Sequence, residues 1–224
     1  MKRFVFLLAL LAGCSGGRGS SALPTLPAAT QAQVQVAIPQ PAPGIIYYAL
    51  GDSITNNPID TTAFSFPAVL AQDMGMKMEN VGVPGEDVQR LLATEVPKID
   101  PATCGLVTLE SGGPNLISFR QDASTVEPVF AQAYHNAFYR CPHGTVVIAT
   151  YINNAEQPAV HQNIANYNEW LRAFAKHNHA PLADLDRDSR FNDPPFPSQN
   201  LYNWFHPNVL GMQQVAQDFE AVIK

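Results

Sequence analysis

From residue 45 onward, short apolar runs alternate with longer segments whose apolar residues recur at helical spacing. Strands are predicted at 45–50, 77–81, 106–109, 145–150 and 180–185, and helices at 62–74, 86–96, 124–139, 162–177 and 208–223. Short strands separated by helices predict an α/β domain in which a five-stranded parallel sheet is covered on both faces. Because such sheets carry reactive loops beyond the carboxyl ends of their strands, functional residues are expected directly after each strand.

The N-terminus has the features of an export signal. Lys2 and Arg3 precede an apolar stretch, 4–11, that is too short to span a bilayer. The segment ends in Leu-Ala-Gly-Cys, which resembles the lipobox of bacterial lipoproteins. The resemblance implies that a signal peptide of residues 1–13 is removed and that the thiol of Cys14 is lipidated. The alternative is an ordinary secretory peptide with an incidental cysteine.

Residues 14–43 are rich in Ser, Gly, Ala, Gln and Pro and show no persistent helical or strand period. Such a composition buries too little apolar surface to offset its ordering entropy, so a flexible tether is expected. The folded domain is then 44–224. A lipid on Cys14 would hold this domain in the cell envelope, on the extracytoplasmic side of a bacterial membrane.

The charge balance narrows the choice of partners. The chain has 13 basic and 19 acidic residues, which gives a formal charge of −6. Nucleic acid is not an expected partner, because phosphates require a basic footprint. A small-molecule or envelope substrate is expected instead, with the membrane contacted through the anchor and the protein a monomer by default.

The two cysteines of the predicted domain, Cys104 and Cys141, each lie just before a predicted strand. In a parallel sheet both would lie at the same edge, so a disulfide is geometrically feasible if those strands are neighbours. The alternative is two unpaired buried thiols. No cysteine or histidine cluster has the spacing of a zinc site, so no structural metal is expected.

Four predicted strands are followed by residues that suit nucleophilic catalysis. Gly-Asp-Ser after the first strand places Ser53 on a tight turn that exposes its hydroxyl group. Gly85 follows the second strand and Asn115 the third, where a backbone N–H and a side-chain amide could stabilise a developing oxyanion. His206 follows the fifth strand and precedes the last predicted helix. Each motif alone is weak, but the four occur in a consistent order.

Together these motifs resemble the SGNH hydrolase superfamily, also called GDSL lipases and esterases. The resemblance covers residues 45–224 and implies a flavodoxin-like three-layer α/β/α sandwich. It implies that Ser53 is the nucleophile and His206 the base of a serine hydrolase acting on ester bonds. Its oxyanion hole would be formed by the N–H groups of Ser53 and Gly85 and by the amide of Asn115, and no cofactor would be required.

Two positions depart from the family pattern. Leu116 follows Asn115 where the family usually has an aspartate, and Asn203 occupies the position of the acid, three residues before the histidine. An asparagine can steady the imidazole through its carbonyl oxygen but offers no negative charge.

Three mechanisms therefore remain open at this point. Ser53 and His206 act as a dyad with Asn203 in support, or a carboxylate from the segment after the fifth strand replaces the acid, or the site binds ligands without turnover. The candidate carboxylates are Asp184, Asp186 and Asp188.

The substrate is not specified by these motifs. Several aromatic residues are candidates for an acyl site, although aromatic residues near a sheet edge more often belong to the core: Phe64, Phe66, Tyr151 and Trp204. Short acyl esters, lysophospholipids and acetylated polysaccharides all remain open. Two other classes of protein also remain: a tethered protein that binds envelope glycan or ester ligands without turnover, and an inert envelope scaffold. Chemical activation of Ser53 distinguishes the hydrolase from both.

Overall fold

The computed structural model describes residues 44–57, 64–192, 199–203 and 205–223. The signal peptide, the lipidated cysteine and the tether predicted at 1–43 lie outside the described residues, as does Trp204. Within the described part of the chain, no helix is both long and apolar enough to cross a membrane.

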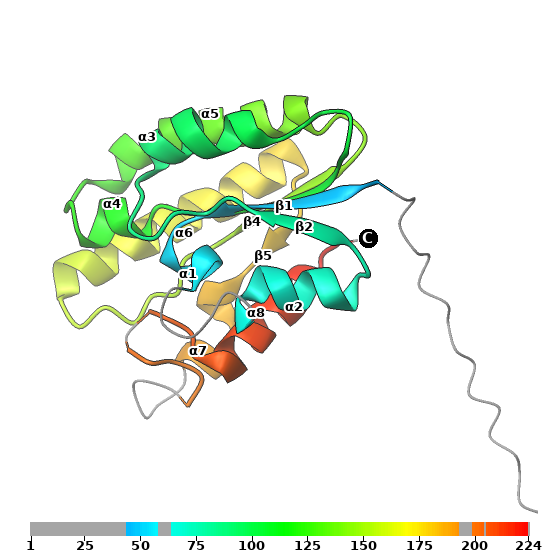
Figure 1. Cartoon of the computed structure of the whole chain (residues 1–224). Helices are drawn as coiled ribbons and strands as arrows, with labels where there is room; N and C mark the ends of the chain where they lie inside the picture. The colour runs from blue at the N-terminus through cyan, green and yellow to red at the C-terminus, as the bar shows by residue number, and fades with distance from the viewer. Residues whose placement is uncertain (1–43, 58–63, 193–198, 204, 224) are drawn as a thin grey trace, which may run out of the picture. The chain divides into compact units, whose positions relative to one another are not determined.

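A single parallel sheet of five strands, in the order β2-β1-β3-β4-β5, forms the centre of the domain (Figure 1). The strands are β1 (Ile46–Gly51), β2 (Lys77–Asn80), β3 (Cys104–Glu110), β4 (Thr145–Ala149) and β5 (Leu182–Ala183). The chain moves from β1 outward to β2 and then returns past β1 to β3. The predicted α/β class with a five-stranded parallel sheet is confirmed.

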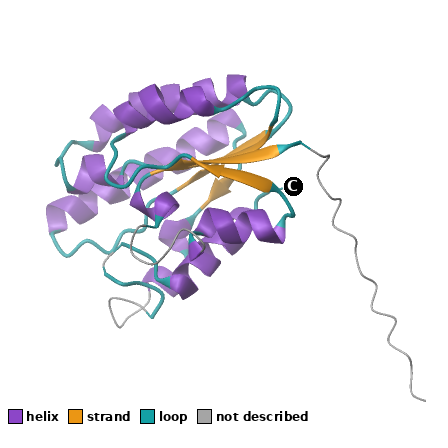
Figure 2. Ribbon diagram, viewed as in Figure 1, coloured by secondary structure: helices purple, strands orange, loops and turns teal. Residues whose placement is uncertain are grey.

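Helices cover both faces of the sheet, which gives three layers (Figure 2). One face carries α3 (Val88–Arg90), α4 (Gly113–Ile117), α5 (Ala123–Arg140) and α6 (Pro158–Asn178). The other carries α2 (Phe66–Asp73) and α8 (Val209–Glu220). The single turns α1 (Ser53–Asn56) and α7 (Ser189–Asn192) lie toward the carboxyl ends of the strands.

Two predicted elements differ from the observed ones. The helix expected at 86–96 is interrupted, because α3 passes into a π-helical turn, Leu91–Glu95, and a 3-10 turn, Val96–Lys98. The strand expected at 180–185 shortens to β5. A 3-10 turn, Leu185–Arg187, follows it, and there the backbone N–H of Asp186 donates to the hydroxyl of Thr150 at 2.9 Å.

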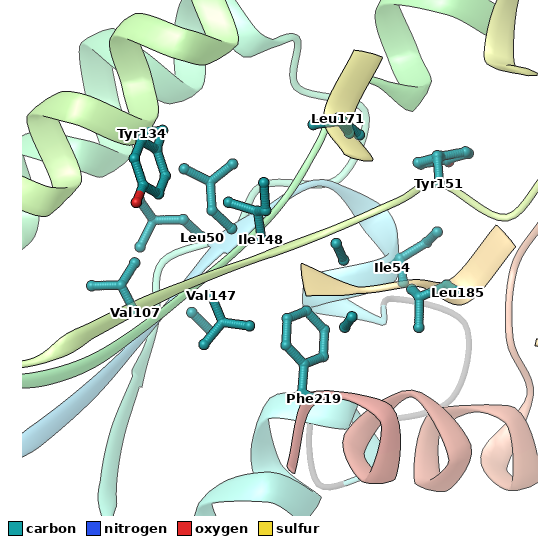
Figure 3. Packing of buried hydrophobic residues seen from close by; sticks show 14 of the residues in the cluster. Leu50, Ile54, Val107, Tyr134, Val147, Ile148, Tyr151, Leu171, Leu185 and Phe219 are labelled. Atoms are coloured by element: carbon teal, nitrogen blue, oxygen red, sulfur yellow. The ribbon is translucent and has the colours of Figure 1, made fainter. Parts of the chain in front are cut away.

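The core is formed where the central strands meet the long helices (Figure 3). The β1 residues from Tyr47 to Leu50 are buried on both sides, as expected for a strand between two helical layers. On the α2/α8 face, Phe66 stacks on Phe219 with ring centroids 4.9 Å apart. Packing of this kind fixes the sheet, and the sheet in turn positions the loops at its carboxyl edge.

Cys104 and Cys141 form a disulfide with an S–S distance of 2.01 Å. Cys104 is the first residue of β3, and Cys141 directly follows α5. Both cysteines are buried. The bond therefore links the start of a central strand to the helix that covers it, at the edge of the sheet opposite the predicted site.

Candidate active site

The turn that carries Ser53 depends on a glycine. Gly51 ends β1 with φ of +153°, and a Cβ atom there would overlap the carbonyl oxygen of Glu110 and the hydroxyl of Thr55. Asp52 then caps α1 by accepting the N–H of Ile54 at 3.0 Å. Ser53 is the first residue of α1 and is partly exposed. The hydroxyl group is thus presented at the carboxyl edge of the sheet.

His206 reaches this hydroxyl from the loop that precedes α8. Its Nε2 lies 2.9 Å from the Oγ of Ser53, across 153 residues of sequence. The carbonyl of His206 accepts the N–H of Tyr202 at 2.8 Å, and the ring of Phe205 lies 4.5 Å from the imidazole. Burial lowers the pKa of His206, so the imidazole is neutral at neutral pH.

Asn203 contacts the other ring nitrogen of His206. Its Oδ1 accepts the backbone N–H groups of Phe205 and His206, at 3.1 and 2.9 Å. This arrangement directs Nδ2 toward Nδ1 of His206, at 3.0 Å. Turning the amide over would forfeit both backbone hydrogen bonds, which are worth about 0.5–1.5 kcal/mol each. The expectation that the carbonyl oxygen of Asn203 accepts the imidazole N–H is therefore wrong, because the backbone already occupies that oxygen.

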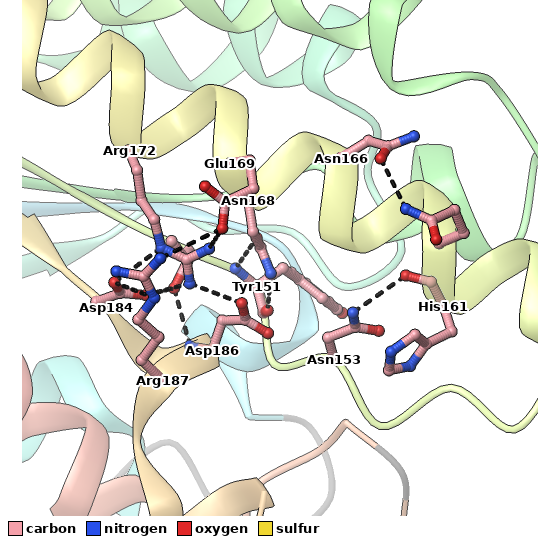
Figure 4. A network of polar contacts seen from close by, with 12 residues as sticks. Tyr151, Asn153, His161, Asn166, Asn168, Glu169, Arg172, Asp184, Asp186 and Arg187 are labelled. Atoms are coloured by element: carbon pink, nitrogen blue, oxygen red, sulfur yellow. Dashed lines mark hydrogen bonds and ion pairs between the residues drawn. The ribbon is translucent and has the colours of Figure 1, made fainter.

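The carboxylates after β5 are held by arginines. Asp184 and Asp186 both accept hydrogen bonds from the guanidinium of Arg172, at 2.7 and 2.6 Å (Figure 4). Asp188 forms an ion pair with Arg190 at 2.8 Å. The Nδ1 of His206 meets an amide rather than any of these groups. In the part of the chain that the structure describes, Ser53 and His206 thus form a pair with no carboxylate on the imidazole.

Gly85 lies in the loop after β2, exposed and with φ of +75°. A Cβ atom there would meet open space, so the glycine is required by the backbone conformation and not by crowding. The loop is tied to the nucleophile turn, because Asn56 donates to the carbonyl of Gly82 at 2.8 Å and Asn80 donates to that of Thr55 at 2.9 Å.

Asn115 is fully buried in α4. Its Oδ1 accepts the N–H of Val88 at 3.0 Å, and its amide hydrogens are accepted by Gln89 at 2.9 Å and Gln121 at 2.8 Å. Both hydrogens are therefore occupied, and one glutamine would have to move before Asn115 could donate to an oxyanion. Among the described residues, neither the N–H of Ser53 nor that of Gly85 is taken by a hydrogen-bond acceptor.

An apolar cavity of about 150 Å³ lies beside His206. Phe205, which packs on the imidazole, is one of its walls. The other lining residues come from α4, the loop after α4, the loop after β4 and α6: Ile117, Arg120, Ile152, Ala155, Glu156, Gln157, Val160 and Ile164. Of the aromatic residues predicted to form an acyl site, Phe66 and Tyr151 are buried in the core and Phe64 is exposed.

Two buried acids near the nucleophile were not predicted from the sequence. Glu95 accepts the N–H of Gly51 at 2.8 Å, and Glu110, the last residue of β3, pairs in register with Gly51. Glu110 could have been recognised from the sequence, because a charged residue at the end of an apolar strand is unusual. Glu95 could not, because in the sequence it looks like an ordinary solvated residue of a helix. Within residues 44–57, 64–192, 199–203 and 205–223, no group of histidine, cysteine and acidic side chains is arranged to hold a metal ion.

Comparisons with known proteins identify the family and agree with the fold. Residues 49–214 match the GDSL-like Lipase/Acylhydrolase family. No match was found among curated proteins.

Several solved structures have the same fold. A putative lipolytic protein of the G-D-S-L family from Desulfitobacterium hafniense has a TM-score of 0.69 at 20% identity, over 80% of this chain and 99% of that one. Phospholipase A1 from Streptomyces albidoflavus has a TM-score of 0.63 at 16% identity, over 79% and 99%. An acetyl xylan esterase has a TM-score of 0.64 at 18% identity, over 80% and 100%. At these identities the likeness shows the fold alone.

Proposed function

Because the chain belongs to the GDSL-like lipase/acylhydrolase family, we propose that it is a serine ester hydrolase in which Ser53 is the nucleophile and His206 the general base. The observation that carries the proposal is the 2.9 Å contact between the Oγ of Ser53 and the Nε2 of His206. A hydroxyl within hydrogen-bonding reach of a neutral imidazole is the arrangement that nucleophilic acyl transfer requires.

The reaction proceeds in two half-reactions. The hydroxyl proton of Ser53 passes to Nε2 of His206 while Oγ attacks the ester carbonyl carbon, and the imidazolium then protonates the departing alcohol. A water molecule gives a proton to His206 and attacks the acyl-enzyme. The imidazolium then returns that proton to Oγ of Ser53 as the carboxylic acid leaves. The N–H groups of Ser53 and Gly85 stabilise both oxyanions, and Asn115 joins them only if Gln89 or Gln121 moves.

The asparagine at position 203 makes this hydrolase slow. Because Nδ2 of Asn203 donates to Nδ1 of His206, the resting imidazole carries its proton on Nε2, where it cannot accept a proton from Ser53. Attack requires the other tautomer, and forming it breaks the hydrogen bond with Asn203. In a serine protease, replacing the triad aspartate by asparagine selects the same unproductive tautomer and lowers turnover about ten-thousand-fold.

The cavity beside His206 favours an ester of a small or medium apolar acid. A cavity of about 150 Å³ with mostly aliphatic and aromatic walls holds a molecule of about six carbons. Ile117, Ile152 and Phe205 supply apolar walls for an acyl chain. Of the polar lining residues, Arg120 already donates to Gln157 at 2.6 Å. An acyl chain of about four to six carbons fits this space, and an acetyl group leaves part of it empty.

Export and lipidation belong to the same proposal. The lipobox-like ending at Cys14 supports a lipid anchor, and the composition of 14–43 supports a tether to the membrane. In this arrangement the enzyme acts on esters of the cell envelope from the extracytoplasmic side, as a monomer. Metabolic labelling with a palmitate analogue tests this, because labelling of the wild type should disappear in Cys14→Ala.

The hydrolase is tested with the purified chain and nitrophenyl esters of two to ten acyl carbons. Wild type should turn over the mid-length esters, and Ser53→Ala should reduce turnover to the level without enzyme. The occupied amides of Asn203 and Asn115 favour a second candidate, a protein that binds esters without hydrolysing them. That candidate predicts no Ser53-dependent turnover, together with ester binding that survives in Ser53→Ala.

A further inference from the structure

Three carboxyl groups lie directly behind the nucleophile turn. Asp52 precedes Ser53, Glu110 ends the neighbouring strand β3, and Glu95 ends the π-helical turn after α3. All three side chains are fully buried. One oxygen of each carboxyl group accepts no hydrogen bond from the described residues. These oxygens are Asp52 Oδ2, Glu95 Oε1 and Glu110 Oε1. Buried charge without such partners is strongly destabilising, so this cluster requires an explanation.

Glu95 holds the backbone from which the turn begins. Its Oε2 accepts the N–H of Gly51 at 2.8 Å, and the carbonyl of Gly51 accepts the N–H of Val83 at 2.9 Å. Gly51 is thus fixed on one side by Glu95 and on the other by the loop that carries Gly85. A shift of Gly51 would displace both the nucleophile and the oxyanion donors.

Asp52 and Glu110 lie within hydrogen-bonding reach of one another. Asp52 uses Oδ1 to cap α1, and Glu110 uses Oε2 for a long contact of 3.5 Å with the hydroxyl of Thr55. The remaining oxygens, Oδ2 and Oε1, are the two without a donor. A single proton held between the two carboxyl groups supplies the missing hydrogen bond.

The groups around the cluster offer little positive charge. Tyr151 and Tyr167 face the Asp52–Glu110 pair, and Glu127 lies beyond Tyr167. Glu95 faces Glu86 and, more weakly, Lys98. Among the described residues, no cation contributes to the electrostatics of Asp52 or Glu110. Two adjacent buried carboxylates without a cation cannot both remain ionised.

We propose that these acids are positioning residues for Ser53, with Asp52 and Glu110 sharing one proton and Glu95 neutral, so that the nucleophile turn keeps its geometry only while the cluster is protonated. This inference rests on the proposed role of Ser53. The protons do not take part in the reaction. They hold Gly51 and Asp52 in place, and through them the hydroxyl and N–H groups of Ser53.

The electrostatics of the individual groups agree with this assignment. Burial raises the pKa of Glu95 to about 9, and the neighbouring carboxylate of Glu86 adds to the rise. Burial raises the pKa of Asp52, and burial together with the charge of Asp52 raises that of Glu110. For each acid the folded pKa exceeds the unfolded one, so the stabilisation is complete at acid pH and is lost as pH rises through the folded values.

Replacing each buried acid by its amide, in the purified full chain, tests whether the cluster holds protons. Glu110→Gln supplies the shared hydrogen at every pH, and Asp52→Asn supplies it from the other side. Glu79→Gln is the matched control, because Glu79 is exposed on β2. Glu95→Gln keeps an acceptor for the N–H of Gly51 without titrating, whereas Glu95→Ala removes it.

Three quantities are measured in each variant: the infrared band of protonated carboxyl groups at neutral pH, the melting temperature from acid to alkaline pH, and the rate at which a fluorophosphonate labels Ser53. Wild type and Glu79→Gln should show the band and lose melting temperature and labelling rate at alkaline pH. In Glu110→Gln or Asp52→Asn, the loss of melting temperature and the loss of labelling rate should both move to higher pH. The infrared band of protonated carboxyl groups should be weaker than in wild type. Glu95→Ala should label on the order of a hundred-fold more slowly, and Glu95→Gln should restore the rate.

Identical pH dependence in wild type and both amide variants would overturn the proposal, as would the absence of the infrared band in wild type. Failure of the proposed catalytic function is distinguishable from failure of the proposal on the buried acids. A chain that never labels at Ser53 is not the hydrolase, yet its infrared band and melting temperatures still show whether the acids hold protons.

Discussion

Asn203 and His206 meet through two nitrogen atoms, Nδ2 of the amide and Nδ1 of the imidazole, 3.0 Å apart. Only the amide can supply the hydrogen between them once Oδ1 of Asn203 has accepted the N–H groups of Phe205 and His206. The imidazole proton is thereby placed on Nε2, which faces Ser53. Asn203 thus lies where the acid of a catalytic triad would lie, but it presents a hydrogen-bond donor to Nδ1 of His206 where a triad requires an acceptor.

Asn203→Asp should therefore activate the enzyme. One carboxylate oxygen would keep the two backbone hydrogen bonds, and the other would accept the N–H of Nδ1, which frees Nε2 to take the proton of Ser53. We expect kcat/KM for nitrophenyl hexanoate to rise on the order of a hundred-fold or more. Asn166→Asp, with the same charge change on the exposed face of α6, should leave the rate unchanged. An equal or lower rate in Asn203→Asp would contradict this account of the tautomer.

The same substitution should move the acid limb of the pH profile. In wild type, burial lowers the pKa of His206, so the neutral base persists to lower pH than for an exposed histidine. A carboxylate at Nδ1 favours the imidazolium and raises that pKa. The acid limb of kcat/KM in Asn203→Asp should thus lie at higher pH than in wild type. Profiles that coincide would show that position 203 has no electrostatic contact with the titrating base.

The size of the apolar cavity should determine the preferred acyl chain. Ala155 lines the cavity and is partly exposed, so a larger side chain there fills the space without entering the core. Ala155→Phe should reduce hydrolysis of hexanoate about ten-fold or more and spare acetate. Ala155→Ser is the matched control and should keep the wild-type preference. Parallel losses on both esters in Ala155→Phe would show that the acyl chain binds elsewhere.

Removal of the disulfide should affect stability and spare the site. The bond between Cys104 and Cys141 spans 37 positions of sequence, and loop closure of that length contributes about 4 kcal/mol. The double variant Cys104→Ala/Cys141→Ala should lower the free energy of unfolding by about 2–4 kcal/mol, measured by urea titration. Its kcat/KM at a temperature where it remains folded should match wild type. A selective loss of turnover in the folded variant would oppose a purely structural role.

Much of the site could be predicted because residues that directly follow parallel strands meet at one edge of the sheet. Ser53 follows β1 and Gly85 follows β2, so sequence order alone placed them at one edge of the sheet. The orientation of the Asn203 amide could not be predicted, since it depends on two backbone N–H groups that converge only in the folded loop. Asn115 is similar, because its hydrogens are taken by glutamines at positions 89 and 121.

Burial decides which candidates belong to the site. Phe66 and Tyr151 lie in the core, the commoner place for aromatic residues near a sheet edge, and Ile117 and Ile152 line the cavity instead. Glu95 was not recognised at all. A glutamate at the end of a helical pattern resembles a solvated position, and only the folded chain shows that it is buried against Gly51.

Covalent trapping of Ser53 by a fluorophosphonate, with the adduct located by peptide mass spectrometry, tests whether His206 activates the nucleophile. We expect a single adduct on Ser53 in the wild-type chain, faster labelling in Asn203→Asp, and none in Ser53→Ala. A folded wild-type chain and a folded Asn203→Asp variant that both remain unlabelled would contradict this expectation, because Ser53 would then not be activated by His206 at all.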